Sequence, residues 1–100
     1  MDLNVNQLKE KIDKGEDFVL IDVREPHEHE EFNVGGQLIP LGTIATKIAE
    51  LEDRKDQEVV VYCRSGGRSG MAQQLLIQSG FKNVKNLTGG MLAWQDAFGK

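Results

Sequence analysis

Two continuous apolar runs constrain the fold of this sequence more than any other feature. Residues 18–23 read FVLIDV, and residues 59–62 read VVVY. Unbroken runs of this length are typical of strands buried on both faces, as in a parallel sheet. Residues 43–52 lie between the runs and have apolar positions at helical spacing. This order of strand, helix and strand predicts an α/β fold.

Shorter segments continue the alternation along the chain. Further strands are expected at residues 3–5, 37–39, 57–63 and 83–87, and helices at residues 6–14 behind an Asn6 cap, from Pro26 onward, and at residues 69–79 and 91–98. Alternating strands and helices predict a parallel sheet with helices on both of its faces. In such sheets the ligand site lies beyond the carboxyl ends of the strands.

Length and charge exclude several classes of protein. The chain forms one domain, residues 1–100, because it has no room for two independent cores. Its formal net charge of −4 argues against a general nucleic-acid binder, which needs a broad basic face. The sequence begins without a basic segment followed by an apolar one, and no stretch approaches the roughly 20 apolar residues of a membrane-spanning helix. We therefore expect a soluble, cytoplasmic protein with neither nucleic acid nor a membrane as partner.

The chain contains a single cysteine, Cys63. One cysteine excludes an intramolecular disulfide, a C-x-x-C redox pair and a multi-cysteine zinc site. Two interpretations remain open, a buried inert thiol and a lone reactive thiol. Position alone favours the inert thiol, because a cysteine that ends a buried strand is most often a small core residue.

The residues that follow Cys63 favour the reactive thiol. Residues 63–70 read CRSGGRSG, and two glycines let the backbone curl so that successive N–H groups point inward. The next helix directs its N-terminal partial positive charge to the same place. Arg64 and Arg68 add permanent positive charge, so we expect a lowered pKa for the Cys63 thiol and a thiolate nucleophile. An arginine in the first turn of a helix opposes the helix dipole, and Arg68 is therefore expected to hold an anion.

At this point the sequence resembles a known family, the single-domain rhodaneses, which are thiosulfate sulfurtransferases. Four segments carry the resemblance: residues 20–26 (LIDVREP), 60–63 (VVYC), 63–69 (CRSGGRS) and 87–94 (LTGGMLAW). They look like the family's first strand and turn, the strand entering its active loop, the loop itself and the closing segment. A cysteine and an arginine separated by four residues are a weak signal alone, whereas the ordered set spans nearly the whole chain and is a strong one.

The resemblance implies a five-stranded, mostly parallel sheet and a reaction that needs no cofactor. Cys63 would accept a sulfane sulfur as a persulfide from thiosulfate or a similar small anionic donor. The sulfur would then pass to a thiophilic acceptor, which is a thiol, cyanide or a protein. The implied catalytic residue is Cys63, and the implied substrate-binding loop comprises Arg64, Ser65, Gly66, Gly67 and Arg68. Because the chain has no second cysteine, no resolving thiol within it can discharge the persulfide.

One segment departs from the family pattern. Many relatives carry a His-Ile-Pro-Gly-Ala stretch after the first strand, where residues 33–40 of this chain read NVGGQLIP. The difference bears on the shape of that loop and on the choice of partner, and it leaves the nucleophile unchanged.

Two alternative functions stay open. A cysteine phosphatase also holds an oxyanion with a loop and an arginine at a helix N-terminus, but its C-x5-R signature needs one residue more than separates Cys63 from Arg68. A persulfide carrier that acts only with a protein partner would share the nucleophile and the loop. Turnover of small thiols distinguishes a free enzyme from such a carrier.

Other polar residues in or just after the apolar run 18–23 are interpreted as structural. His27 and His29 lie in an acidic segment that we expect to be exposed. No metal site is predicted from them, because residues two apart on a helix diverge by about 200°. Asp22 and Arg24 are expected to brace the active loop through hydrogen bonds without being catalytic.

Core positions are expected on the last two helices. In residues 69–79 an apolar face is predicted opposite a polar one. The apolar face comprises Met71, Ala72, Leu75 and Leu76, and the polar face Gln73, Gln74 and Gln78. Trp94 and Phe98 stand four residues apart in the final helix and are expected to pack in the core.

Overall fold

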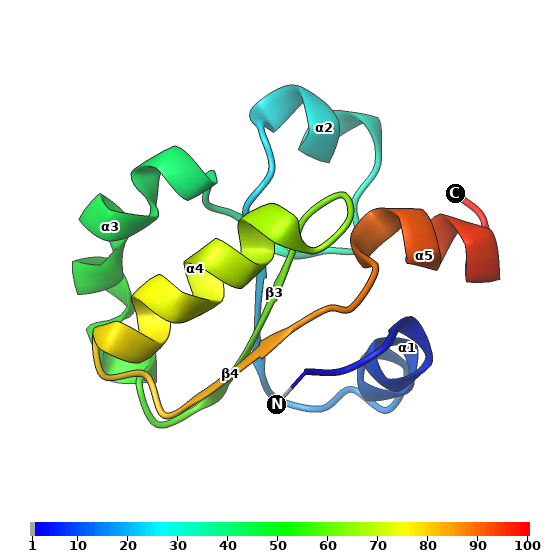
Figure 1. Ribbon diagram of the computed structural model, residues 1–100. Helices are drawn as coiled ribbons and strands as arrows, with labels where there is room; N and C mark the ends of the chain where they lie inside the picture. The colour runs from blue at the N-terminus through cyan, green and yellow to red at the C-terminus, as the bar shows by residue number, and fades with distance from the viewer. Residues whose placement is uncertain (1) are drawn as a thin grey trace.

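The computed structural model describes residues 2–100 as a layered α/β domain (Figure 1). The elements in chain order are α1 (Val5–Asp13), β1 (Val19–Asp22), α2 (Pro26–Glu31), β2 (Gln37–Leu38), the 3-10 turn η1 (Leu41–Thr43), α3 (Ile44–Lys47), the 3-10 helix η2 (Ile48–Arg54), β3 (Glu58–Tyr62), α4 (Gly67–Gln78), β4 (Asn83–Asn86) and α5 (Gly90–Phe98). All strand pairs are parallel, in the order β2-β1-β3-β4. In residues 2–100 no helix is long and apolar enough to cross a membrane.

The two faces of the sheet support two separate cores. Side chains alternate along β3 and beyond its end, so Val59, Val61 and Cys63 face one core while Val60 and Tyr62 face the other. In Figure 1, α3 and α4 lie on one side of the strands, and α1 and α5 lie on the other. This arrangement confirms the prediction of a parallel sheet with helices on both faces.

The sheet has four strands in residues 2–100, and the expected fifth strand at residues 3–5 is wrong. Only Leu3 pairs there, through a single parallel bridge to Leu87. The chain turns into α1 immediately afterwards because Asn4, rather than Asn6, caps that helix. The Asn4 side-chain oxygen accepts a hydrogen bond from the Gln7 N–H at 2.9 Å, which leaves no room for a longer strand.

The single helix expected at residues 43–52 is also wrong in detail. The segment consists of η1, α3 and η2, and only four of its residues are α-helical. Its apolar pattern is kept, since Ile44 and Leu51 are buried and Ile48 packs against the same core. Over one or two turns such a pattern fits 3.0 residues per turn as well as 3.6, so it does not reveal the tighter winding.

Helix α4 is rotated relative to the expected apolar face. Its buried residues are Ser69, Ala72, Gln73 and Leu76, whereas Met71 is 62% exposed and Leu75 is also exposed. Gln73 is buried because its amide donates a hydrogen bond to the Val84 carbonyl oxygen of β4 at 3.0 Å. That bond satisfies a polar group under the helix, and Met71 is left in solvent.

The core packing expected for Trp94 and Phe98 in the final helix, α5, is found only in part. Trp94 is half-buried and packs against the core shared with α1, and its ring contacts Phe98 edge to face at a centroid distance of 4.9 Å. Phe98 itself is 38% exposed, so it covers the edge of that core and is not part of it.

Candidate active site

Cys63 lies directly after β3, at the carboxyl end of the parallel strands. The loop that follows it turns at Gly66, whose φ of 112° is in the left-handed region, and α4 begins at the next residue. In Figure 1 this loop joins β3 to α4 near α2 and the first turn of α5. The predicted placement of the cysteine is therefore confirmed, with α4 beginning two residues earlier than expected.

The Cys63 sulfur is buried, with 1% of the residue exposed, and two donors lie close to it. The Gly66 N–H donates to Sγ at 3.0 Å, and the Ser69 hydroxyl lies 3.3 Å from it. Burial by itself would raise the pKa of this thiol, but the Ser69 hydroxyl and the N–H groups of Ser69, Gly66 and Ser65 outweigh that effect. The result is a lowered pKa, as the sequence predicts.

Ser69 contacts the Cys63 sulfur and is a site residue that sequence reasoning missed. It is fully buried at the third position of α4, where its hydroxyl reaches back toward the sulfur. The signal available in the sequence was a hydroxyl in the first turn of the helix that follows the cysteine. Asn86 was missed as well, because it comes from β4, and its side chain bonds both Ser69 and the Gly66 carbonyl.

The first turn of α5 holds the backbone of the active loop. The N–H groups of Met91 and Leu92 donate to the carbonyl oxygens of Cys63 and Arg64, each at 2.9 Å. These helix N–H groups have no partner within α5, so the loop carbonyls satisfy them. With the two carbonyls bound to α5, the N–H groups of the loop remain available to the sulfur.

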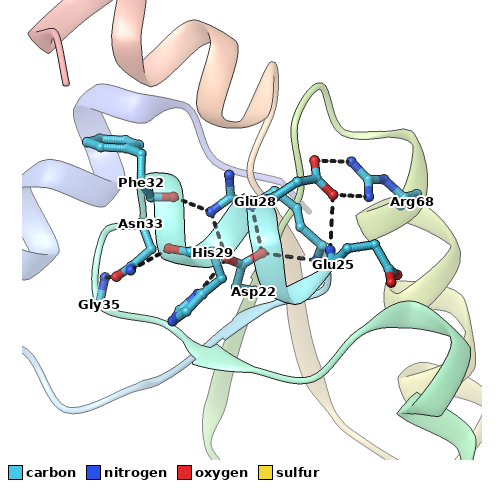
Figure 2. Close-up of polar contacts among 9 residues, drawn as sticks. Asp22, Glu25, Glu28, His29, Phe32, Asn33, Gly35 and Arg68 are labelled. Carbon is cyan, nitrogen blue, oxygen red and sulfur yellow. Dashed lines mark hydrogen bonds and ion pairs between the residues drawn. The ribbon is translucent and has the colours of Figure 1, made fainter.

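Arg68 stands at the start of α4 and is engaged by a carboxylate. Its two Nη atoms donate to the two oxygens of Glu28 at 2.7 and 2.9 Å, and the Glu25 N–H donates to the same carboxylate at 3.0 Å (Figure 2). The Arg68 hydrogen bonds lower the pKa of Glu28 to about 2, so this carboxylate is ionised at neutral pH. The predicted anion-holding arginine thus already holds an anion from α2.

Arg64, Ser65 and Gly67 are exposed on the outer side of the loop. Arg64 has no ion-pair or hydrogen-bond partner for its side chain in residues 2–100. It lines a surface pocket of about 260 Å³ together with residues of α2 and α5, among them Glu31 and Leu92, and with Phe32, which follows α2. Of the predicted loop, the Gly66 N–H donates to the sulfur and the Ser65 N–H helps to lower the pKa of the Cys63 thiol, while Arg68 is half-buried and Arg64 is exposed.

Asp22 and Arg24 form a buried ion pair whose role differs from the expected one. The Arg24 guanidinium donates to both Asp22 oxygens and to the Phe32 carbonyl oxygen at the end of α2. His29 Nδ1 lies 2.8 Å from the Asp22 carboxylate, so His29 is half-buried rather than exposed (Figure 2). These bonds join β1 to α2, and no hydrogen bond in residues 2–100 joins the pair to the residues that follow Cys63.

The segment that departs from the family pattern, residues 33–40, follows α2 and contains β2. Asn33 donates through its amide to the His29 carbonyl oxygen at 2.9 Å, and its oxygen accepts from the Gly35 N–H at 2.8 Å (Figure 2). Gly36 packs so closely on the Tyr62 ring that an added Cβ would lie 2.7 Å from it. In residues 2–100, no group of three or more His, Cys, Asp or Glu side chains is arranged to hold a metal ion.

Comparison with known proteins gives these features a common context. The family model described as Rhodanese-like domain matches residues 4–97. A protein of Allochromatium vinosum named "Sulfurtransferase" is 36% identical over 94 residues, which cover 93% of this chain and 86% of that protein. A Bacillus subtilis protein, "Putative sulfur carrier protein YrkF", is 35% identical over 93% of this chain, which spans only 50% of that relative. A solved structure from Rhodopseudomonas palustris, described as a protein of unknown function and possible tyrosine phosphatase, has a TM-score of 0.88 and 29% identity, covering 99% of this chain and 82% of its own.

Proposed function

We propose a reaction for this chain on the premise that it belongs to the Rhodanese-like domain family. The chain is a sulfurtransferase in which Cys63 takes a sulfane sulfur from thiosulfate or a similar donor and passes it to a thiophilic acceptor. The observation that carries the proposal is the environment of the Cys63 sulfur. The sulfur is buried, the Gly66 N–H donates a hydrogen bond to it, and the Ser69 hydroxyl lies 3.3 Å away. Such an environment stabilises a sulfur anion.

The first half-reaction loads the cysteine. The Cys63 thiolate attacks the outer sulfur of thiosulfate, a new S–S bond forms, and the bond between the two sulfurs of thiosulfate breaks. Sulfite leaves with the electron pair of the broken bond, so the total charge is conserved. The negative charge that began on Cys63 Sγ ends on the terminal sulfur of the persulfide, where the N–H groups of the loop stabilise it.

The second half-reaction discharges the persulfide. A thiol, cyanide or the thiol of an acceptor protein attacks the terminal sulfur, and the Cys63 thiolate leaves. The chain has one cysteine, so the attacking group comes from another molecule. Arg64 is exposed at the edge of the neighbouring pocket, where it is available to an anionic donor or acceptor.

A carrier that transfers sulfur only to a protein partner is the second candidate. The similarity to a relative named as a sulfur carrier favours it. The two candidates differ in the second half-reaction, because a free enzyme turns over with small thiols or cyanide and a carrier does not.

A cysteine phosphatase is less favoured, although one similar structure is described in those terms. Four residues separate Cys63 from Arg68, and the guanidinium of Arg68 is already occupied by Glu28. Hydrolysis of an aryl phosphate that is lost in Cys63→Ser would support this reading.

The test is to incubate the purified protein with thiosulfate and measure its intact mass. We expect a gain of one sulfur atom that is removed by cyanide and absent in Cys63→Ser. A wild-type protein that gains no sulfur from thiosulfate or from a low-molecular-weight persulfide contradicts the proposal.

A further inference from the structure

The Ser69 hydroxyl lies between three acceptors and has one proton. Its Oγ is 3.3 Å from Cys63 Sγ, 3.2 Å from the Gly66 carbonyl oxygen and 2.5 Å from the Asn86 Oδ1. A serine hydroxyl donates a single hydrogen bond, so it can serve only one of these acceptors at a time. Ser69 is fully buried, and water does not take the place of a missing partner easily.

The Gly66 carbonyl is already satisfied by other donors. It accepts from the Gly70 N–H at 2.9 Å and from the Asn86 amide nitrogen at 3.1 Å. A carbonyl oxygen has two lone pairs, and these two bonds use both. The bond from Asn86 also sets the orientation of its amide, which leaves Asn86 Oδ1 facing the Ser69 hydroxyl. The Ser69 proton is therefore shared between Asn86 and the Cys63 sulfur.

We propose that Asn86 is a positioning residue that draws the Ser69 hydroxyl proton away from the Cys63 sulfur and so restrains the reactivity of the thiol. In the protonated state, Cys63 S–H donates to Ser69 Oγ, Ser69 donates to Asn86 Oδ1, and every proton has an acceptor. When the sulfur is ionised, the hydroxyl turns toward it, and Asn86 loses its donor. Asn86 thus favours the thiol over the thiolate.

The same competition applies after sulfur loading. The charge of a persulfide lies mainly on the terminal sulfur, one bond farther from Ser69 than Sγ. The hydroxyl can then return to Asn86, which favours the loaded state over the free thiolate. The inference takes from the proposed function only that Cys63 is the nucleophile.

The effects of Asn86 and Ser69 on the reactivity of the thiol can be separated from those of the charged groups around the cysteine. Arg68 of α4, Glu28 of α2 and Arg64 of the loop are charged side chains around this site, and the Asp2 carboxylate accepts a hydrogen bond from the Asn86 backbone N–H at 3.1 Å. None of these four is altered in the variants that test the proposal. A change in thiol reactivity in those variants therefore reports the hydrogen bonds.

The experiment is a double-mutant cycle of Asn86→Ala and Ser69→Ala, read as the rate of alkylation of the single thiol by iodoacetamide against pH. Ser69→Ala should raise the apparent pKa of Cys63, because a donor to the thiolate is lost. Asn86→Ala should lower it, so that alkylation below the pKa becomes about three- to tenfold faster. The Gly66 carbonyl loses one donor in this variant but keeps Gly70, and at 3.2 Å from the Ser69 hydroxyl it competes less strongly than the lost Asn86 Oδ1 at 2.5 Å. In the Ser69→Ala background, Asn86→Ala should leave the pH profile unchanged.

Two further variants keep the test decisive. Asn86→Asp retains an oxygen facing Ser69 and adds negative charge, so it should raise the apparent pKa of Cys63, opposite to Asn86→Ala. Asn83→Ala changes an exposed asparagine at the other end of β4 and should have no effect. A raised pKa in Asn86→Ala, or an equal shift with and without Ser69, overturns the proposal and leaves Asn86 as an anchor for Gly66. Because alkylation needs no sulfur donor, this outcome is independent of whether the protein accepts sulfur from thiosulfate.

Discussion

At Gly90 the first turn of α5 meets the active loop with no space for a side chain. Its φ of 55° lies in the left-handed region, and an added Cβ would sit against the carbonyls of Cys63 and Arg64, 2.6 Å from the latter oxygen. Those are the carbonyls that Met91 and Leu92 bind. The absence of a side chain at Gly90 therefore permits the hydrogen bonds between α5 and the active loop.

Gly90→Ala should destabilise the protein by about 3 kcal/mol, because the strained backbone and the clash with the loop both oppose the side chain. Denaturant unfolding measures this loss. Gly15→Ala is the matched control, since Gly15 has a φ of 65° but no atom within 4 Å of an added Cβ. The control should lose only about 1 kcal/mol. Equal losses in the two variants would show that the contact with the loop is unimportant.

Among the elements, α2 is tied to the active site by a pair of opposite charges. Glu28 in its first turn binds Arg68 of α4, and the end of the helix is held by Arg24 and His29 against Asp22 (Figure 2). The chain between β1 and β2 thus joins the sheet to the loop without touching the sulfur. Glu28 and Arg68 carry opposite charges, so their pairing contributes to stability in a pH-dependent way.

The substitution Glu28→Gln tests how the contribution of the Glu28–Arg68 ion pair to stability depends on pH. The pKa of Glu28 is about 2 in the folded protein against 4.5 ordinarily, so its ionised form stabilises the fold. That contribution is complete above about pH 4.5 and is lost as the pH falls toward 2. Because Arg68 is a third exposed, we expect about 1 kcal/mol at neutral pH rather than the full value of the shift.

The measurement is the difference in unfolding free energy between wild type and Glu28→Gln across this pH range. The two proteins should differ at pH 6 and converge near pH 2. Glu30→Gln is the control, because Glu30 is exposed on the same helix and has no ion-pair partner in residues 2–100. A difference that persists at pH 2 would contradict an electrostatic role for Glu28.

The elements also show which parts of the structure can be predicted from sequence. The strands β1 and β3 and the loop after Cys63 are predictable because their signals are local, in continuous apolar runs and in glycines beside the cysteine. The rotation of α4 is not, since Gln73 is buried by a bond to the Val84 carbonyl of another element. The local sequence of α4 does not reveal that the Val84 carbonyl lies under this helix.

The same distinction applies within the site. Cys63 and Gly66 are three residues apart and were predicted together. Ser69 and Asn86 are 17 residues apart, and Glu28 and Arg68 are 40 apart, so each pair exists only through the tertiary fold. Sequence reasoning identified the charge of Arg68 correctly and missed that a carboxylate of the same chain neutralises it.

At the scale of the whole molecule, the sheet separates two cores, and only one of them contains Cys63. One core lies under α4 and contains Cys63, and the other lies between the sheet and helices α1 and α5. In Figure 1, α1 and α5, the first and last helices of the chain, lie on the same side of the sheet. The protein carries a formal net charge of −4, whereas two hydrogen-bond donors, the Gly66 N–H and the Ser69 hydroxyl, lie next to the Cys63 sulfur.

This separation predicts that two equally buried leucines affect the cysteine differently. Leu8 in α1 and Leu76 in α4 are both fully buried, so Leu8→Ala and Leu76→Ala should each cost about 3 kcal/mol of unfolding free energy. Only Leu76 shares a core with Cys63. Loosening α4 should expose the sulfur through local opening and speed its alkylation under native conditions, while Leu8→Ala leaves that rate close to the wild-type value. Equal acceleration in the two variants would mean that the cysteine becomes accessible only through global unfolding, and that the sheet does not isolate the active site from the opposite face.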